Sequence, residues 1–88
     1  MSKITFAENA WEDYLYWQIQ DKKILKNINL LLKEIQRTPF EGSGKPEPLR
    51  GELSGSWSRR ITEKDRLVYE IADGTVLVKQ CKGHYSDR

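Results

Sequence analysis

The sequence contains very little cysteine and histidine, no long apolar run and almost no net charge. Cys81 is the only cysteine among 88 residues, which excludes an internal disulfide and predicts a reducing, cytoplasmic location. No segment approaches the roughly 18 consecutive apolar residues of a membrane span, so we expect no membrane association. Fifteen Lys and Arg against 13 Asp and Glu leave a net charge of +2, which is too small to indicate a nucleic-acid partner by itself.

The length favours one small domain over residues 1–88. Hydrophobic residues make up 38% of the chain and charged residues 32%, as in ordinary soluble globular proteins. A domain of this size has a marginal core, and its three tryptophans are of a residue type that usually keeps one edge in solvent. We therefore expect a partner surface, either for another protein or for a homodimer.

Two helices are predicted in the first half, after a short strand at Lys3–Phe6. Apolar residues recur at helical spacing over residues 7–19, which predicts an amphipathic helix. Its apolar positions are Trp11, Tyr14, Leu15 and Ile19. Asp21 is suited to cap the next helix, because its carboxylate can accept the first unpaired N–H groups. The following isoleucine and leucine stripe ends near Arg37, since Pro39 disfavours a helical residue before it.

A loop rich in Pro and Gly separates these helices from a run of strands. Residues 39–56 hold all three prolines of the chain. Three strands are expected after it, at Ser56–Thr62, Arg66–Ala72 and Thr75–Gly83, the last two joined by an Asp73-Gly74 hairpin turn. The order β-α-α-β-β-β predicts an α+β fold, with two N-terminal helices packed on one face of a mostly antiparallel sheet.

Two motif fragments in the chain are incomplete. Gly42-Ser-Gly-Lys45 resembles the end of a phosphate-binding P-loop, but Pro39 and Pro46 stand where that motif needs Gly and Ser or Thr. Cys81 and His84 are spaced like half a zinc site, and the chain holds no further Cys or His to complete it. The sequence therefore predicts neither a metal nor another cofactor, and Cys81 is interpreted as a buried strand residue.

A remaining group of residues is suited to acid–base chemistry on a phosphate. Cleavage of an RNA phosphodiester by its own 2′-hydroxyl needs a base for the hydroxyl proton, an acid for the leaving 5′ oxygen and positive charge for the phosphorane. Glu47 and His84 can supply the base and the acid, and a planar guanidinium matches phosphate oxygens. The arginines concerned are Arg59, Arg60 and Arg66.

Each of these residues also has a simpler interpretation. Glu47 can be a solvated loop carboxylate, and the prolines beside it favour extended backbone at both Lys45 and Glu47. Arg59 and Arg60 point to opposite faces of a strand, so at most one of them serves a given site. Arg66 is equally suited to an edge strand, where a charge blocks unwanted pairing. The aromatic residues of the first helix are interpreted as packing groups rather than base-stacking platforms: Trp11, Tyr14, Tyr16 and Trp17.

Several stretches of the chain resemble a known protein family. The most specific is Trp57-Ser-Arg-Arg-Ile-Thr-Glu63, followed by Arg66-Leu-Val-Tyr69 and by His84-Tyr85 near the end. The other matching stretches are residues 11–17, 37–42, 44–49 and 53–55. Together these motifs are similar to the YoeB/Txe toxins of the RelE superfamily, which belong to bacterial type II toxin–antitoxin systems. The match covers nearly the whole chain in register.

The resemblance implies a RelE-like fold, with two helices against a curved antiparallel sheet, and an mRNA endoribonuclease that acts in the A site of the 70S ribosome. It implies that Glu47 is the general base, that His84 is the general acid and that Arg66 stabilises the transition-state phosphate. A second phosphate contact then falls on Arg60, and the aromatic partner of the histidine is Tyr85.

Two positions depart from the family pattern. Arg50, which with Lys45 is expected to contact RNA, stands at a basic position that is often Lys in relatives. The chain also continues as Ser86-Asp87-Arg88 beyond a His-Tyr pair that usually lies at or near the end of the chain. If these residues fold back, they restrict the reach of His84.

The family resemblance also implies partners. It implies an antitoxin of the YefM or Axe type, whose disordered tail folds over the toxin, and operator DNA bound only through that antitoxin. Two other functions stay open, a non-catalytic RNA- or ribosome-binding module and an antitoxin-partnered transcriptional co-repressor. Glu47 argues against the binding module, because a carboxylate in a phosphate groove opposes binding unless it takes part in chemistry.

Overall fold

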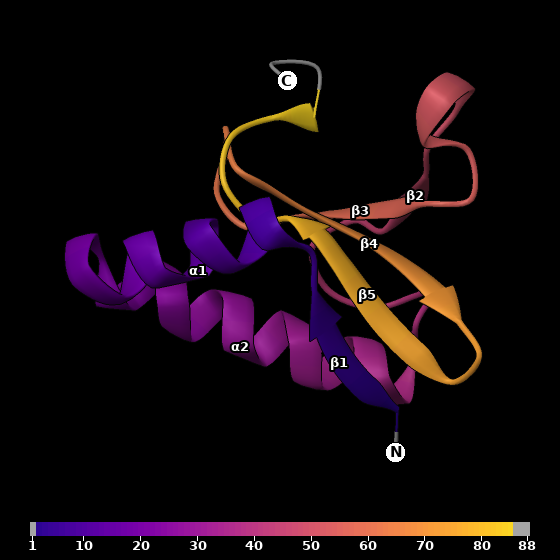
Figure 1. Ribbon diagram of the computed structural model, residues 1–88, viewed down its shortest axis with the longest axis horizontal. Coiled ribbons are helices and arrows are strands. Elements are labelled where there is room, and N and C mark those ends of the chain that lie inside the picture. The colour runs from indigo at the N-terminus through magenta and orange to yellow at the C-terminus, as the bar shows by residue number, and fades with distance from the viewer. Residues whose placement is uncertain (1, 86–88) are drawn as a thin grey trace.

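The structure, a computed structural model, describes residues 2–85. Two helices lie against one face of a twisted five-stranded sheet with strand order β1-β5-β4-β3-β2 (Figure 1). The sheet is antiparallel except that β1 runs parallel to β5, so the predicted α+β fold is confirmed. The elements are β1 (Lys3–Phe6), α1 (Glu8–Gln20), α2 (Lys22–Arg37), β2 (Glu47–Pro48), β3 (Trp57–Arg60), β4 (Arg66–Ala72) and β5 (Thr75–Gln80), with a short 3-10 helix at Gly51–Leu53.

The second helix follows its sequence pattern. The Asp21 carboxylate accepts the backbone N–H groups of Lys23 and Ile24 at 3.0 and 3.3 Å, which is the predicted cap. The buried residues of α2 are Ile28, Leu31, Leu32 and Ile35. The helix ends at Arg37, as the proline that follows requires. Among the described residues, neither helix has the length and apolar content to cross a membrane.

The first helix buries a different side from the predicted one. Its buried residues are Ala10, Asp13 and Trp17. The indole N–H of Trp17 donates to the Cys81 carbonyl at 2.8 Å, and the Asp13 carboxylate accepts the Cys81 N–H at 3.1 Å. These contacts leave three of the four predicted stripe residues exposed, whereas Tyr14 is partly buried against the core. The large apolar side chains that α1 exposes are Trp11 (46%), Leu15 (38%), Tyr16 (42%) and Ile19 (81%). A packing role is therefore confirmed for Trp17 and Tyr14. Trp11 and Tyr16 are more exposed, and they contact the rings of Tyr14 and Trp17 respectively.

The late strands lie where they are predicted, with several differences. β3 spans Trp57–Arg60 rather than Ser56–Thr62. Asp73 and Gly74 form the expected hairpin turn, with φ of 50° and 71°. The last strand ends at Gln80 rather than Gly83, because the Gly83 N–H donates to the Asp65 carboxylate at 2.8 Å and draws the chain away from the sheet. The loop 39–56 contributes β2, which the sequence did not predict. β4 lies between β5 and β3, so the interpretation of Arg66 as an edge-strand charge is wrong.

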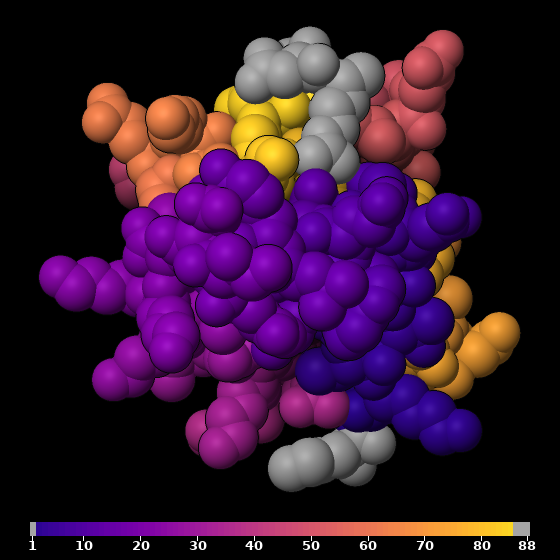
Figure 2. Space-filling view, turned by 60° about the vertical axis from the view of Figure 1, so that its left-hand side comes forward, coloured from indigo at the N-terminus to yellow at the C-terminus, as the bar shows by residue number. Residues whose placement is uncertain are grey.

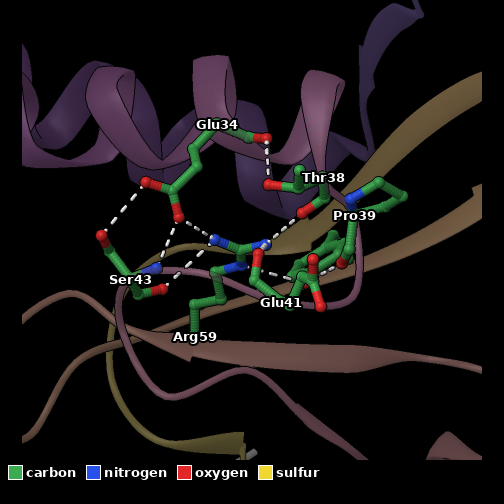
Figure 3. A network of polar contacts seen from close by, with 7 residues as sticks. Glu34, Thr38, Pro39, Glu41, Ser43 and Arg59 are labelled. Carbon is green, nitrogen blue, oxygen red and sulfur yellow. Dashed lines mark hydrogen bonds and ion pairs between the residues drawn. The ribbon is translucent and has the colours of Figure 1, made fainter.

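A buried arginine fastens the loop after α2 to the sheet (Figure 3). Arg59 on β3 is fully buried, and its guanidinium donates to the Glu34 carboxylate at 2.6 Å and to the Tyr69 hydroxyl at 3.1 Å. Its remaining N–H groups donate to the loop carbonyls of Thr38, Glu41 and Ser43. Every N–H group of the guanidinium therefore has an acceptor, which a buried charge requires.

Glu34 joins this network to the loop backbone. The backbone N–H of Ser43 lowers the pKa of Glu34 below its ordinary value of 4.5, and the Ser43 hydroxyl and the Arg59 charge act in the same direction, against desolvation. Because the folded pKa is depressed, the carboxylate stabilises the fold above that ordinary value and loses the effect as pH falls through the folded value. Gly42 has φ of 124°, and a Cβ there would lie 2.1 Å from the Glu34 carboxylate, so the loop passes this point only as glycine.

We expect Arg59→Met to lower the free energy of unfolding by about 3 kcal/mol, because it leaves three loop carbonyls and the Tyr69 hydroxyl without their donor. Chemical denaturation at one fixed protein concentration measures the change. Arg60→Met is the matched control, since Arg60 is exposed on the opposite face of the same strand, and it should stay within about 0.5 kcal/mol of the wild type. Equal losses in the two variants would contradict this role for the buried arginine.

Candidate active site

A pocket of about 190 Å³ lies on the side of β3 that faces away from α2. Its lining residues are Lys45, Glu47, Ser58, Arg60, Arg66 and His84. Side chains alternate across a strand, so Ser58 and Arg60 point away from the helices when Arg59 points toward α2. The prediction that the two arginines face opposite ways is confirmed, and Arg60 is the one that reaches the pocket.

The register of the sheet brings the lining residues together. Glu47 on β2 lies opposite Ser58 on β3, and Arg60 at the end of β3 lies opposite Arg66 at the start of β4. Ser58 and Arg60 are two residues apart, so all four side chains share one face at one end of the sheet. The short pairing of β2 with β3 thus fixes the position of Glu47, the predicted base. The extended backbone predicted at Glu47 is confirmed.

The Arg66 guanidinium is held by the turn that precedes it. Its Nη1 donates to the backbone carbonyls of Thr62, Glu63 and Asp65 at 3.0, 3.0 and 3.1 Å. This leaves Nε and Nη2 without a hydrogen bond to any residue in the range 2–85. A guanidinium fixed along one edge in this way can present its other edge to a phosphate without losing much side-chain freedom on binding.

Asp65 connects the same turn to the C-terminal segment. Its carboxylate accepts the Thr62 hydroxyl at 2.7 Å and the Gly83 N–H at 2.8 Å, while the Gly83 carbonyl accepts the Arg66 N–H at 2.9 Å. These bonds return the chain to the sheet immediately before His84. Asp65 is itself buried, with 4% of its surface exposed. A single carboxylate therefore sets the positions of both Arg66 and His84.

Tyr85 lies beside the pocket, between Glu47 and His84, and lines the neighbouring hollow. Its ring centroid lies 4.2 Å from that of His84, and its hydroxyl donates to the Glu47 carboxylate at 3.3 Å. Burial raises the pKa of the Tyr85 hydroxyl above its ordinary value, the Glu47 carboxylate raises it further, and the charge of Arg66 lowers it. The hydroxyl therefore stays protonated at neutral pH and acts as a donor to the carboxylate.

The two further predicted RNA contacts lie in different places. Lys45 lines the pocket, but its φ of 51° shows that the predicted extended backbone is wrong there. The reason is that the Gly44 carbonyl accepts the Arg60 N–H at 2.7 Å, which bends the chain before the proline. Arg50 lies outside the pocket, in a neighbouring hollow that Glu47 and Tyr85 also line. The extension at residues 86–88 lies outside the described residues.

The pocket carries three cationic side chains and one carboxylate. This balance suits an anion such as a phosphodiester, with Glu47 and His84 as the groups able to exchange a proton with it. Within residues 2–85, no three His, Cys, Asp or Glu side chains gather in a way that could hold a metal ion. Glu47 and His84, beside the three cationic side chains, are placed where they could transfer protons to and from a bound phosphate.

Comparison with known proteins places the chain in a family. Residues 6–85 match the family described as YoeB-like toxin of bacterial type II toxin–antitoxin system. The chain belongs to this family. The YoeB toxin of Escherichia coli strain K12 is 58% identical over 83 residues, which cover 94% of this chain and 99% of the relative.

Solved structures of relatives share the fold of this toxin. A heterotetrameric YoeB–YefM complex from Staphylococcus aureus contains a chain that superposes with a TM-score of 0.89 at 49% identity, covering 97% of this chain and 99% of that one. A YoeB dimer from the same organism superposes with a TM-score of 0.89 at 49% identity, covering 96% and 98%. The expected family and fold are therefore confirmed.

Sequence reasoning missed two residues of the site. Ser58 lines the pocket between Glu47 and Arg60, and nothing in its sequence context distinguishes it from other strand serines. Asp65 lies between two of the predicted strands, and no role was expected for it. The spacing from Thr62 to Asp65 was an available signal, because the Thr62 hydroxyl accepts the Asp65 N–H at 3.0 Å, a contact typical of side-chain-stabilised turns.

Proposed function

We propose that this toxin is an mRNA endoribonuclease that cleaves messages in the A site of the ribosome. The observation that carries the proposal is the convergence of Glu47, Arg66 and His84 on one small pocket, although they come from three distant parts of the sequence. Membership of the YoeB-like toxins supports an action against translation. The cytoplasm, where ribosomes translate, is the compartment that this function requires.

The proposed reaction transfers the phosphoryl group within the substrate. Glu47 takes the proton of the 2′-hydroxyl, whose oxygen forms a bond to the adjacent phosphorus. His84 gives its proton to the 5′ oxygen as the bond between that oxygen and phosphorus breaks. Arg66, with Arg60 and Lys45, offsets the additional negative charge on the phosphorane. The products are a 2′,3′-cyclic phosphate on the upstream fragment and a 5′-hydroxyl on the downstream fragment.

Tyr85 contacts both of the side chains that are proposed to transfer protons. Its hydroxyl donates to Glu47, and its ring packs against the His84 imidazole. The hydrogen bond orients the carboxylate, while the ring contact restricts the imidazole. We therefore assign to Tyr85 the positioning of these two groups, and to Arg50 a contact with RNA outside the reacting centre.

The proposed partners are an antitoxin of the YefM type and a second copy of the toxin. The heterotetrameric YoeB–YefM complex and the YoeB dimer of the Staphylococcus aureus relatives support both. Operator DNA would be bound only through the antitoxin, since the toxin itself carries a net charge of +2.

Cleavage with and without ribosomes tests this function. A chain with little net charge has few phosphate contacts to hold free RNA, so the A site must supply most of the positioning. We expect a message on translating ribosomes to be cut about 100-fold faster or more than the same naked message at physiological salt. Primer extension over a time course measures both rates.

Two results would contradict the proposal. Rapid, site-specific cleavage of naked message at that salt would remove the need for the ribosome. Inhibition of translation without any cleavage would instead support a non-catalytic ribosome binder.

A further inference from the structure

An irregularity in β5 turns one side chain toward the candidate active site. Val78 lies in the core between the sheet and the helices, so strict alternation would carry Gln80 to the same side. The register of β5 against β4 shifts between Val68 and Tyr69, however, and Gln80 lies opposite Val68. Lys79 is therefore an additional residue in β5, as in a β-bulge, and it reverses the alternation.

The bulge places Gln80 on the pocket face of the sheet. Val68 also lies opposite Ser58, which lines the pocket, so Gln80 belongs to the same row across the sheet. Cys81, the next residue, packs into the core on the helix side. Gln80 is only 6% exposed and is not among the residues that line the pocket. It is therefore buried beside the site and does not face a substrate.

The Gln80 amide binds the segment that carries His84. Its Nε2 donates to the Lys82 and Gly83 carbonyls, both at 3.1 Å, which uses both of its N–H groups. The Gly83 carbonyl belongs to the planar peptide group that also contains the His84 nitrogen, so a bond that orients this carbonyl orients the start of His84. Between positions 2 and 85, Gln80 is the only residue that donates to the Lys82 carbonyl.

A second set of bonds holds the same segment to the start of β4. The Gly83 N–H donates to the Asp65 carboxylate at 2.8 Å, and the Gly83 carbonyl accepts the Arg66 N–H at 2.9 Å. Figure 2 shows the yellow C-terminal segment at the top of the molecule, between the violet helices and the orange turn before β4. Without the Gln80 amide, Gly83 would be attached to the β4 side alone.

We propose that Gln80 is a positioning residue, which holds the His84 imidazole where it can give its proton to the leaving 5′ oxygen. The proposal rests on the proposed function, in which His84 is the acid. Gln80 does not touch the reacting atoms and acts through the two carbonyls before the histidine. A displacement of about 1 Å can slow a reaction about 100-fold, so loss of the amide should affect mainly the chemical step.

Substitution of Gln80 tests this effect on the chemical step. Gln80→Met keeps the approximate length and removes both N–H donors, so single-turnover cleavage on ribosomes should slow by about tenfold or more at saturating toxin. The toxin concentration that gives half of the maximal rate should change by less than about twofold, because the cations Lys45, Arg60 and Arg66 are unchanged. Gln80→Asn keeps an amide that is one methylene shorter, and it should lose less of the rate.

Gln36→Met is the matched control. The Gln36 amide is half-buried on α2 and donates to the Ser2 carbonyl, outside the pocket. The control makes the same substitution and loses the same kind of hydrogen bond, so it should cleave at the wild-type rate. Melting temperatures show whether the variants are folded, and if Gln80→Met is unfolded, Gln80→Asn provides the test.

A message with sulfur in place of the leaving 5′ oxygen identifies the group through which Gln80 acts. Thiols ionise close to neutral pH, so the thiolate leaves with its electron pair and needs no proton from an acid. His84→Ala and Gln80→Met should both cleave this message within about threefold of the wild-type rate. Glu47→Ala should keep its full loss, since the 2′-hydroxyl still needs a base.

The outcomes separate this proposal from the proposed function. Wild-type rates for Gln80→Met on the ordinary message, or an equal loss in Gln36→Met, would overturn the role of Gln80. A Gln80→Met loss that persists on the sulfur message while the His84→Ala loss disappears would also overturn it, and the proposed acid would stand. A His84→Ala loss that persists on the sulfur message would overturn the proposed acid itself, and the role of Gln80 with it.

Discussion

A message that carries a 2′-O-methyl group at the nucleotide before the cut should not be cleaved by the toxin, although it should still enter the ribosome and be translated up to that codon. The 2′-oxygen is then blocked and cannot attack the adjacent phosphorus. The unmodified hydroxyl gains the effective molarity of an intramolecular nucleophile, on the order of 10⁵ M or more, which Glu47 cannot replace with water. Toeprinting and primer extension measure ribosome position and cleavage on the same message.

The products provide a second measurement of the same mechanism. The upstream fragment of the unmodified message should end in a 2′,3′-cyclic phosphate or the 3′-phosphate derived from it, and the downstream fragment should begin with a 5′-hydroxyl. EDTA should have no effect at a concentration that leaves enough magnesium for the ribosome, because the proposed proton transfers use only Glu47 and His84. Cleavage of the 2′-O-methyl message would show that water is the nucleophile and that these two roles are wrong.

Replacement of Glu47, His84 or Arg66 should reduce cleavage on the ribosome by about 10²- to 10⁴-fold and suppress growth arrest on induction. Glu47→Ala removes the proposed base and His84→Ala removes the proposed acid. Arg66→Lys keeps the charge but loses the planar fork that contacts phosphate oxygens while the turn carbonyls hold its other edge. Single-turnover cleavage on purified ribosomes measures the three rates.

Measurements of the melting temperature and of antitoxin binding distinguish catalytic from structural effects of these substitutions. Glu47 is exposed and His84 is only partly buried, so their variants should keep the melting temperature of the wild type within a few degrees. Glu52→Ala and Arg37→Ala are matched controls with exposed charges outside the pocket, and they should retain full activity. Full toxicity in all three site variants would rule out the assignment. Lost toxicity with a large fall in melting temperature would indicate a structural role for that residue.

The candidate site was predictable as a set of residue types but not as an arrangement. The imidazole could be named because His84 is the only histidine, whereas the family resemblance was needed to select Glu47 and Arg66 among 13 acidic and 15 basic residues. Their convergence depends on the pairing of β2 with β3 and on the Asp65 contact with Gly83. A two-residue strand and a single buried carboxylate leave almost no periodic signal in the sequence.

The two helices likewise differ in how much of their structure could be predicted from the sequence. α2 could be predicted in detail because its stripe, its cap at Asp21 and its end before Pro39 all act within a few residues. The apolar residues of α1 instead extend around the helix, so local spacing could not identify the buried side. Trp17 and Asp13 form hydrogen bonds with the Cys81 backbone, and these contacts between distant parts of the chain decide which side of α1 is buried.

The sequence by itself determined the two helices, the four strands other than β2, the order of these elements, the hairpin at Asp73-Gly74 and the alternation that sends Arg59 and Arg60 to opposite faces. These features arise from backbone preferences and side-chain periods that act over a few residues. Only the tertiary structure decided that Arg59 is buried against Glu34, that Arg60 lines the pocket and that α1 leaves an apolar face exposed. Those outcomes depend on which distant segments meet, because burial and hydrogen-bond satisfaction are properties of the packed chain rather than of any one segment.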